Sequence, residues 1–119
     1  MITEDYCSYE VAKLLKKKGF DEESLYYYSP TGSMYYNVHW TERDTNWIPK
    51  PTHQMAMKWL REVHRKYIDI RYNNQNEKYR FIVFTMVKDK PIDFIHSEFH
   101  STYEETTEAA LFYVLENLI

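Results

Sequence analysis

The spacing of apolar residues changes along the chain, and this change constrains the fold more than any other feature of the sequence. In three segments apolar residues recur every three or four positions, which is the spacing of one face of a helix. These segments are residues 9–18, 52–66 and 103–118. Between them lie segments rich in Tyr, Phe, Val and Ile, which is typical of β-strands. These are residues 25–28, 34–40, 67–72, 79–87 and, as a further short strand, 92–99.

The resulting order of elements is α-β-β-α-β-β-(β)-α. It predicts an α+β fold with a single antiparallel sheet of about four to five strands and three helices packed on it. A chain of 119 residues has the size of one domain, so residues 1–119 are expected to form a single domain. Residues 41–51 are mostly polar and contain Pro49 and Pro51, which indicates a connector.

Side chains at the predicted helix ends support these boundaries. Ser8 is a suitable N-cap for the first helix, and Gly19 can adopt the left-handed conformation that ends it. Ser101 with Glu104, or Thr102 with Glu105, forms a capping box at the start of the last helix.

The strand predicted over residues 79–87 carries apolar side chains on both faces. Phe81 and Val83 alternate with Ile82 and Phe84. A strand of this kind is expected at the centre of a sheet that is covered, or largely covered, on both sides.

The composition excludes several classes of protein. Only two glycines are present, so a glycine-rich phosphate loop or dinucleotide fingerprint is excluded. Cys7 is the single cysteine, which rules out an intramolecular disulfide and suits a reducing compartment. The first residues are acidic and resemble no signal peptide, and no apolar run is long enough to span a bilayer. We therefore expect a cytoplasmic protein that does not contact the membrane.

Charge is segregated along the sequence although the net charge is only −3. Residues 43–90 carry eleven Lys and Arg against five acids, whereas residues 91–119 carry six acids and neither Lys nor Arg. Either the two segments neutralise each other within the fold or between subunits, or the basic segment binds an acidic partner.

Aromatic residues are more numerous than one small core requires, with twelve Tyr and three Trp. A cluster of them falls on the hairpin predicted over residues 25–40, namely Tyr26, Tyr28, Tyr35, Tyr36 and Trp40. Because neighbours on a strand face opposite ways, some of these rings are expected at the surface. They predict a protein interface that includes this hairpin, with ordinary sheet packing and base stacking as the alternatives.

Two further groups of residues are candidate sites. Lys58, Arg61 and Arg65 form a basic stripe on the second helix, which is either a solvated helix face or a weak contact to nucleic acid. His96, Glu98 and His100 alternate along a predicted strand but match no known zinc spacing, so we expect no metal. Cys7 lacks a recognisable catalytic partner, and we expect neither a catalytic residue nor a cofactor.

Three segments resemble a family of small uncharacterised proteins from prophages and mobile elements of gut Bacteroides-type bacteria. They are residues 8–22 (SYEVAKLLKKKGFDE), 51–64 (PTHQMAMKWLREVH) and 102–119 (TYEETTEAALFYVLENLI). The resemblance implies a phage or mobile-element accessory protein and carries no catalytic residue over. Our hypothesis is a non-enzymatic protein-interaction module that self-associates as a homodimer or binds another protein. The alternatives are a weak nucleic-acid-binding protein that uses the basic stripe and a small enzyme with an unrecognised pocket.

Overall fold

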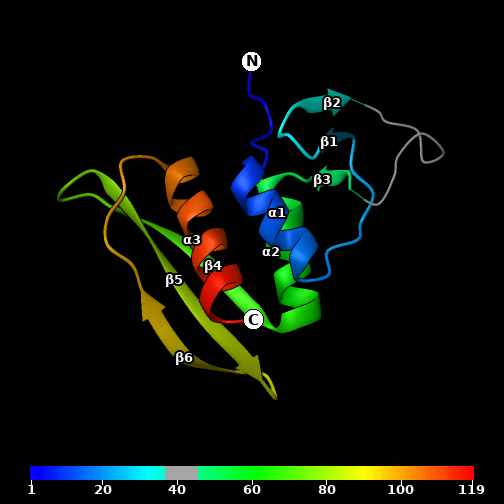
Figure 1. Cartoon of the computed structure of the whole chain (residues 1–119). Helices are drawn as coiled ribbons and strands as arrows, with labels where there is room; N and C mark the ends of the chain where they lie inside the picture. Colours follow the sequence, from blue (N-terminus) through cyan, green and yellow to red (C-terminus); the bar gives the residue numbers. More distant parts are fainter. Residues whose placement is uncertain (37–45) are drawn as a thin grey trace.

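The computed structural model describes residues 1–36 and 46–119 and contains both helices and strands (Figure 1). The helices are α1 (Tyr9–Lys17), α2 (His53–His64) and α3 (Tyr103–Asn117). The strands are β1 (Tyr26–Tyr28), β2 (Met34–Tyr36), β3 (Ile48–Lys50), β4 (Lys66–Asn73), β5 (Lys78–Val87) and β6 (Lys90–His96). The α+β class is therefore confirmed.

Each helix begins at a hydroxyl side chain that accepts a hydrogen bond from a backbone amide of the first turn. Ser8, Thr52 and Thr102 play this part for α1, α2 and α3. For α3 this confirms the second of the two predicted capping registers. Gly19 has a φ of 102° after α1, as expected for a glycine that ends a helix. The helix α2 ends earlier than predicted, because Arg65 adopts a left-handed conformation with a φ of 58°.

The prediction of one continuous sheet is wrong, because the strands form two separate three-stranded antiparallel sheets. The small sheet has the order β2-β1-β3 and the large sheet the order β4-β5-β6. The strand β3 lies in the segment that we predicted to be a connector, and it pairs with β1. The sequence did not predict this strand because it contains Pro49. Proline lacks an amide hydrogen and is tolerated mainly on edge strands. In the small sheet β3 is such an edge strand.

The large sheet has β5 at its centre, as predicted, and Figure 1 shows the helices on one side of it. On that inner face Ile68, Ile70, Phe81 and Val83 pack into the main core together with residues of all three helices. The other face carries Ile82 and Phe84 and is covered by no helix of the described chain. The expectation of cover on both sides is thus met on one side only.

The main core is built from side chains of α1, α2, α3 and the inner face of the large sheet. Its largest fully buried members are Leu15, Leu60, Leu111 and Leu115, and the Phe20 ring packs edge-on against Trp59.

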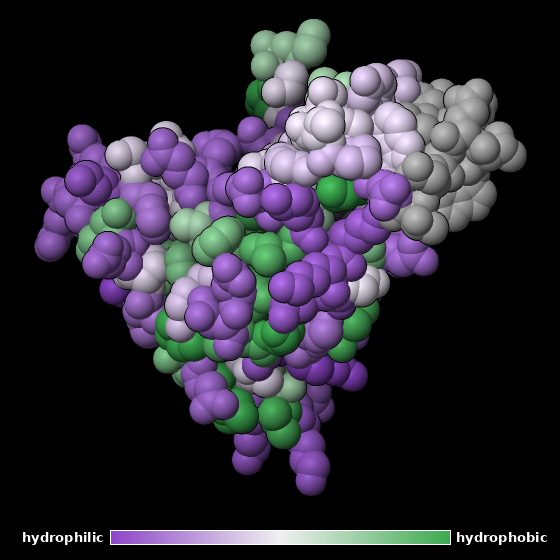
Figure 2. All heavy atoms as spheres, in the orientation of Figure 1, coloured by the Kyte–Doolittle hydropathy of each residue, from purple (hydrophilic) through white to green (hydrophobic). Residues whose placement is uncertain are grey.

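The face seen in Figure 2 has hydrophobic side chains in its middle, with hydrophilic side chains around them. Among the described residues, none of the helices has the length and apolar character that crossing a bilayer requires.

Candidate protein-interaction surface

The tyrosines of the predicted hairpin interface lie in different environments. Tyr28 is buried, and its hydroxyl donates to the carbonyl oxygen of Cys7 at 2.8 Å. Tyr26 is half-buried, whereas Tyr35 and Tyr36 are 48% and 62% exposed. Trp40 lies outside the described residues. The structure thus brings Tyr26 and Tyr36 together and turns Tyr28 inward.

The ring of Tyr26 lies between the ring of Tyr6, from the N-terminal segment, and the ring of Tyr36, from β2. Its centroid lies 5.0 Å from that of Tyr6 and 5.2 Å from that of Tyr36. The ammonium of Lys50 lies 5.2–5.8 Å from the centres of the Tyr6, Tyr26 and Tyr28 rings, so a cation covers part of these tyrosines. Contacts within the chain therefore cover part of the aromatic surface of the hairpin, while Tyr35 and Tyr36 stay exposed. An interface at this hairpin stays a prediction.

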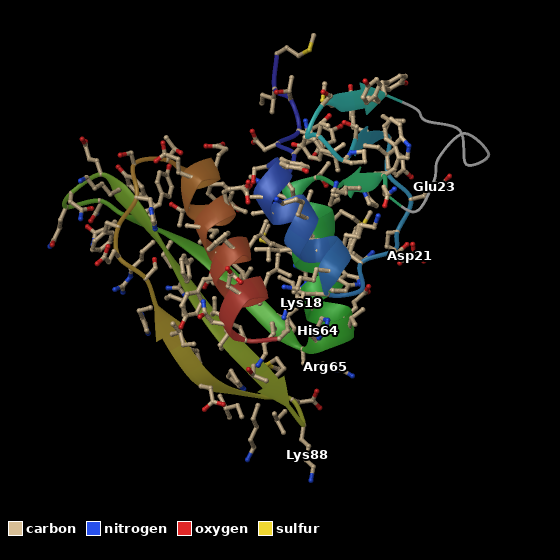
Figure 3. All side chains as sticks on the ribbon, in the orientation of Figure 1. Lys18, Asp21, Glu23, His64, Arg65 and Lys88 are labelled. Atoms are coloured by element: carbon tan, nitrogen blue, oxygen red, sulfur yellow. The ribbon has the colours of Figure 1, made fainter. Side chains whose placement is uncertain are left out.

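The basic stripe of α2 is interrupted at its end. Lys58 is exposed and Arg61 half-buried on the helix, but Arg65 already follows the last helical residue. Figure 3 shows Arg65 and His64 at the same end of the molecule as Lys18 and Lys88. The three predicted residues therefore do not form one continuous row along a helix.

His96 is the last residue of β6, so the alternation assumed for His96, Glu98 and His100 ends with the strand. The His100 ring instead lies parallel to Phe81 at 6.5 Å. Within residues 1–36 and 46–119, no three His, Cys, Asp or Glu side chains are placed to hold a metal ion together.

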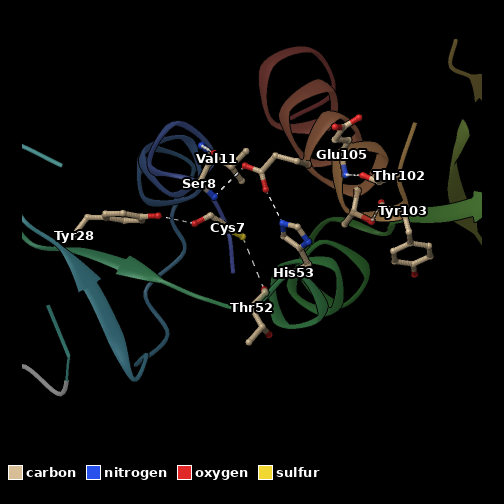
Figure 4. Close-up of polar contacts among 11 residues, drawn as sticks. Cys7, Ser8, Val11, Tyr28, Thr52, His53, Thr102, Tyr103 and Glu105 are labelled. Carbon is tan, nitrogen blue, oxygen red and sulfur yellow. Dashed lines mark hydrogen bonds and ion pairs between the residues drawn. The ribbon is translucent and has the colours of Figure 1, made fainter. Parts of the chain in front are cut away.

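A polar cluster around Glu108 joins the starts of α1 and α2 to α3 (Figure 4). One carboxylate oxygen of Glu108 accepts from the Ser8 amide at 3.0 Å, and the other lies 2.6 Å from Nε2 of His53. Burial raises the pKa of Glu108, but the hydrogen bonds from His53 and Ser8 outweigh burial and lower the pKa below 4.5. The charged carboxylate thus lies at the positive ends of two helices, which stabilises it further.

Cys7 lies beside this cluster and is fully buried. Its thiol faces the carbonyl oxygen of Thr52 at 3.9 Å. Burial, together with the negative charge of Glu108, raises the pKa of the Cys7 thiol far above its ordinary value, although Lys50 opposes this. A nucleophilic cysteine needs an accessible thiolate, so this arrangement suits a packing role rather than nucleophilic catalysis.

The face of the large sheet that points away from the helices carries the clearest candidate surface. We call it the outer sheet face. Its side chains come from alternate positions of β4 and β5 and from the second half of β6 and the residues after it. They are Tyr67, Asp69, Arg71, Arg80, Ile82, Phe84, Met86, Phe94 and Phe99.

Three aromatic rings cross the outer sheet face, one from each strand. Tyr67 stacks on Phe84 at 5.4 Å with an interplanar angle of 13°, and Phe84 lies 5.3 Å from Phe94. We call these three rings the aromatic row. Phe94 is 54% exposed, whereas Tyr67 and Phe84 are partly covered by their neighbours on the sheet. The row therefore presents stacked ring edges and faces to solvent.

A β-bulge in β6 places Phe94 in this row. Ile92 pairs with Thr85 and Ile95 pairs with Val83, so two residues of β6 lie opposite the single residue Phe84. Asp93 absorbs the extra residue with a φ of 56°. Ile95 then joins the core on the inner face, and Phe94 lies beside Phe84 on the outer face.

Charged side chains of both signs lie on the outer sheet face further along β4 and β5 than the aromatic row. Arg71 donates to the Asp69 carboxylate at 2.7 Å, and the Arg80 guanidinium lies 5.6 Å from the centre of the Phe99 ring. The outer sheet face is therefore apolar in its middle and mixed in charge at its edge. Such a face can bind an apolar surface.

Comparison of the chain with protein-family models, curated proteins and solved structures gave no match. The assignment of a function therefore rests on the geometry of the chain itself.

The sequence contained the signal for this surface. The apolar residues Ile82 and Phe84 on the second face of β5 indicate a covered strand face, and the structure leaves this face without a helix of the described chain. The position of Phe94 had no such signal, since strict alternation along residues 92–96 places Ile92 and Phe94 on one face. Only the bulge separates them.

Proposed function

We propose that the protein is a non-enzymatic interaction module that self-associates through the outer sheet face. The observation that carries this proposal is the aromatic row, which lies on a sheet face that no helix of the described chain covers. The largest apolar patch on a protein surface is often functional, and an apolar patch rimmed by polar residues often marks an interface. Large aromatic side chains are also the residues that contribute most to binding at the centre of interfaces.

A second copy is the partner that suits this face best. Two antiparallel sheets pack face to face at about 10 Å with their strands roughly aligned, and a two-fold axis brings identical patches together. Arg71, Arg80 and Asp69 give the edge of the face both signs of charge. An antiparallel pair can then oppose arginine to carboxylate instead of like charges.

The size of the face sets the expected strength of the dimer. Three strands spaced about 4.8 Å apart, each about eight residues long, give a footprint of roughly 400 Å² in projection. A standard interface buries about 800 Å² of accessible surface per partner. The dimer is therefore expected to be weak, with a dissociation constant on the order of micromolar, and to depend on concentration.

The test is the oligomeric state by light scattering during size exclusion, over a range from about 1 to 500 µM around the expected constant. Wild type should shift from monomer to dimer, and Phe94→Ser should remain monomeric. Tyr36→Ser is the matched control, since it removes an exposed ring from the small sheet. A monomeric wild type at all concentrations contradicts the proposal. Dissociation by Tyr36→Ser alone would instead identify the hairpin as the interface.

Single-stranded nucleic acid is the second candidate for this face. Stacked rings beside arginines are the combination that binds unpaired bases and phosphates. It is the weaker candidate, because Arg71 and Arg80 lie toward one end of the face and Asp69 neutralises one of them. Anisotropy with a labelled oligothymidine should show at most weak binding that is lost as salt increases. Tight binding that Arg80→Glu abolishes and Arg61→Glu does not would favour this candidate.

The resemblance to prophage and mobile-element proteins is consistent with an accessory role of this kind, and it stays a prediction. So does the cytoplasmic location.

A further inference from the structure

A groove of about 1060 Å³ runs along α3, on the opposite side of the large sheet from the aromatic row. We call it the α3 groove. Its apolar lining includes Phe81, Ile95, Ala109, Phe112 and Tyr113. Phe112 is 44% exposed although its neighbours Leu111 and Val114 are fully buried. The groove therefore offers apolar surface that the core does not use.

Carboxylates dominate the charged groups of the α3 groove. Five exposed acids line it, and they come from the N-terminal segment, from α1, from the segment after β6 and from the first turn of α3. They are Asp5, Glu10, Glu98, Glu104 and Glu105. Among the described residues that line the groove, Lys50 is the only lysine or arginine, and its ammonium lies over tyrosine rings of the small sheet.

These acids are largely free to meet a ligand. Glu108, the sixth acid of the lining, is held by His53 and Ser8 and does not count among them. Glu10 has a loose contact of 3.9 Å to Lys13. Within the described part of the chain, the carboxylates of Asp5, Glu98 and Glu104 form no ion pair. A cation that entered the groove would thus not have to displace an internal partner.

The dimensions of the groove indicate the size of its occupant. Its lining extends from Glu104 to Asn117, which is about 20 Å along a helix at 1.5 Å per residue. A small cation would leave the apolar lining uncovered, and a nucleic acid would place its phosphates against the acids. An apolar floor with a negative rim complements a peptide that carries apolar anchors between basic residues.

We infer that the α3 groove binds a Lys- and Arg-rich amphipathic segment of another protein. The basic side chains of the segment would face the exposed acids, and its apolar side chains would contact Phe112 and Tyr113. A second copy of this chain is a poorer occupant, because Val11 and Leu15 of its lysine-rich helix α1 are already buried in the core. Acids such as Glu62 and Asp89 interrupt its other basic stretches. This inference is independent of the proposed dimer, since it uses a different face of the molecule.

The test uses a labelled helical peptide of about 14 residues made of Leu and Lys, which spans the groove. Fluorescence anisotropy should show binding that weakens with salt. The Glu104→Gln/Glu105→Gln double variant should weaken it about tenfold, which corresponds to about 1.4 kcal/mol. Phe112→Ser should weaken it by a similar factor, because it removes the apolar anchor site.

Matched variants separate the groove from general electrostatic attraction. Glu62→Gln/Glu116→Gln removes the same charge at exposed positions outside the groove, and Val63→Ser removes an exposed apolar side chain of α2. Both should bind the peptide as wild type does. Equal losses in these controls, or binding of a peptide with every Lys replaced by Glu, would overturn the inference.

The oligomeric state distinguishes the two remaining outcomes. If Glu104→Gln/Glu105→Gln dissociates a wild-type dimer in the absence of peptide, the groove holds a second copy and the inference is wrong. Peptide binding by a monomeric wild type would support the inference while contradicting the proposed dimer.

Discussion

Glu108 is the residue whose local chemistry holds several elements together. Its carboxylate connects α3 to the amide that precedes α1 and to the first residue of α2. His53 is buried, so an uncharged partner would leave buried polar groups poorly satisfied.

We expect Glu108→Gln to lower the free energy of unfolding by about 1–3 kcal/mol at neutral pH, measured by urea denaturation. The folded pKa of Glu108 lies below its ordinary value of 4.5. The stabilisation is therefore complete above that value and is lost as the pH falls through the folded pKa. The difference between wild type and Glu108→Gln should accordingly narrow only below about pH 4.5.

Glu105→Gln is the control for this prediction, because Glu105 is exposed on the same helix three residues earlier. It should change stability by less than about 0.5 kcal/mol. A difference between wild type and Glu108→Gln that stays constant down to pH 3 would show that the carboxylate is not what stabilises the junction.

Among the elements, β6 decides the shape of the outer sheet face. It is an edge strand of the large sheet, and its bulge at Asp93 places Phe94 beside Phe84 while Ile95 stays in the core. Bulges on edge strands also bend the strand and hinder pairing with another edge. This arrangement favours association through the face of the sheet over association through its edge.

The bulge can be tested through Asp93, whose φ of 56° lies in the left-handed region. Asp93→Gly should keep or slightly raise stability, since glycine adopts this conformation without strain. Asp93→Val should lower the free energy of unfolding by about 1–2 kcal/mol, because a β-branched side chain strains this backbone.

Light scattering on the same two variants connects the bulge to association. Asp93→Gly should still form the dimer, whereas Asp93→Val should weaken it by displacing Phe94. An Asp93→Val variant with wild-type stability and wild-type association would show that the bulge does not position the ring.

For the whole molecule, the arrangement of layers separates two surfaces of different character. The helices pack between the two sheets (Figure 1). The α3 groove opens beside α3, and the aromatic row lies on the opposite face of the large sheet. One face is acidic with an apolar floor, and the other is apolar with mixed charge at its edge. The proposed dimer and the proposed peptide complex use separate surfaces, so both could form at the same time.

Association should also be visible in thermal stability. If folded dimer is in equilibrium with monomer, the midpoint Tm rises with protein concentration by mass action. Wild type should show this rise by calorimetry between about 10 and 500 µM, a range that brackets the expected constant. Phe94→Ser should show a constant Tm. A Tm of wild type that does not change with concentration would argue against a folded dimer.

Local signals in the sequence predict most of the helices and strands of this protein. The positions of α1, α2 and α3 follow from helical spacing, and Ser8 and the alternatives Ser101 or Thr102 mark the starts of α1 and α3. These signals are local, because a cap and one apolar stripe involve neighbours within a few residues. The central place of β5 also followed from its apolar residues on both faces.

The grouping of the strands into sheets and the identity of the exposed surfaces depend on contacts between residues that are distant in the sequence. One example is the pairing of Tyr28 with Ile48, which joins β1 to β3. The strand β3 was not predicted, because it contains Pro49 and proline is rare in strands. The partners of Glu108 lie 55 and 100 positions away in the sequence, so no spacing indicates them. No spacing in the sequence indicates the face on which Phe94 lies either. That face depends on one extra residue in the pairing of β6 with β5. A shift of one residue in the pairing turns each later side chain to the other face of the sheet.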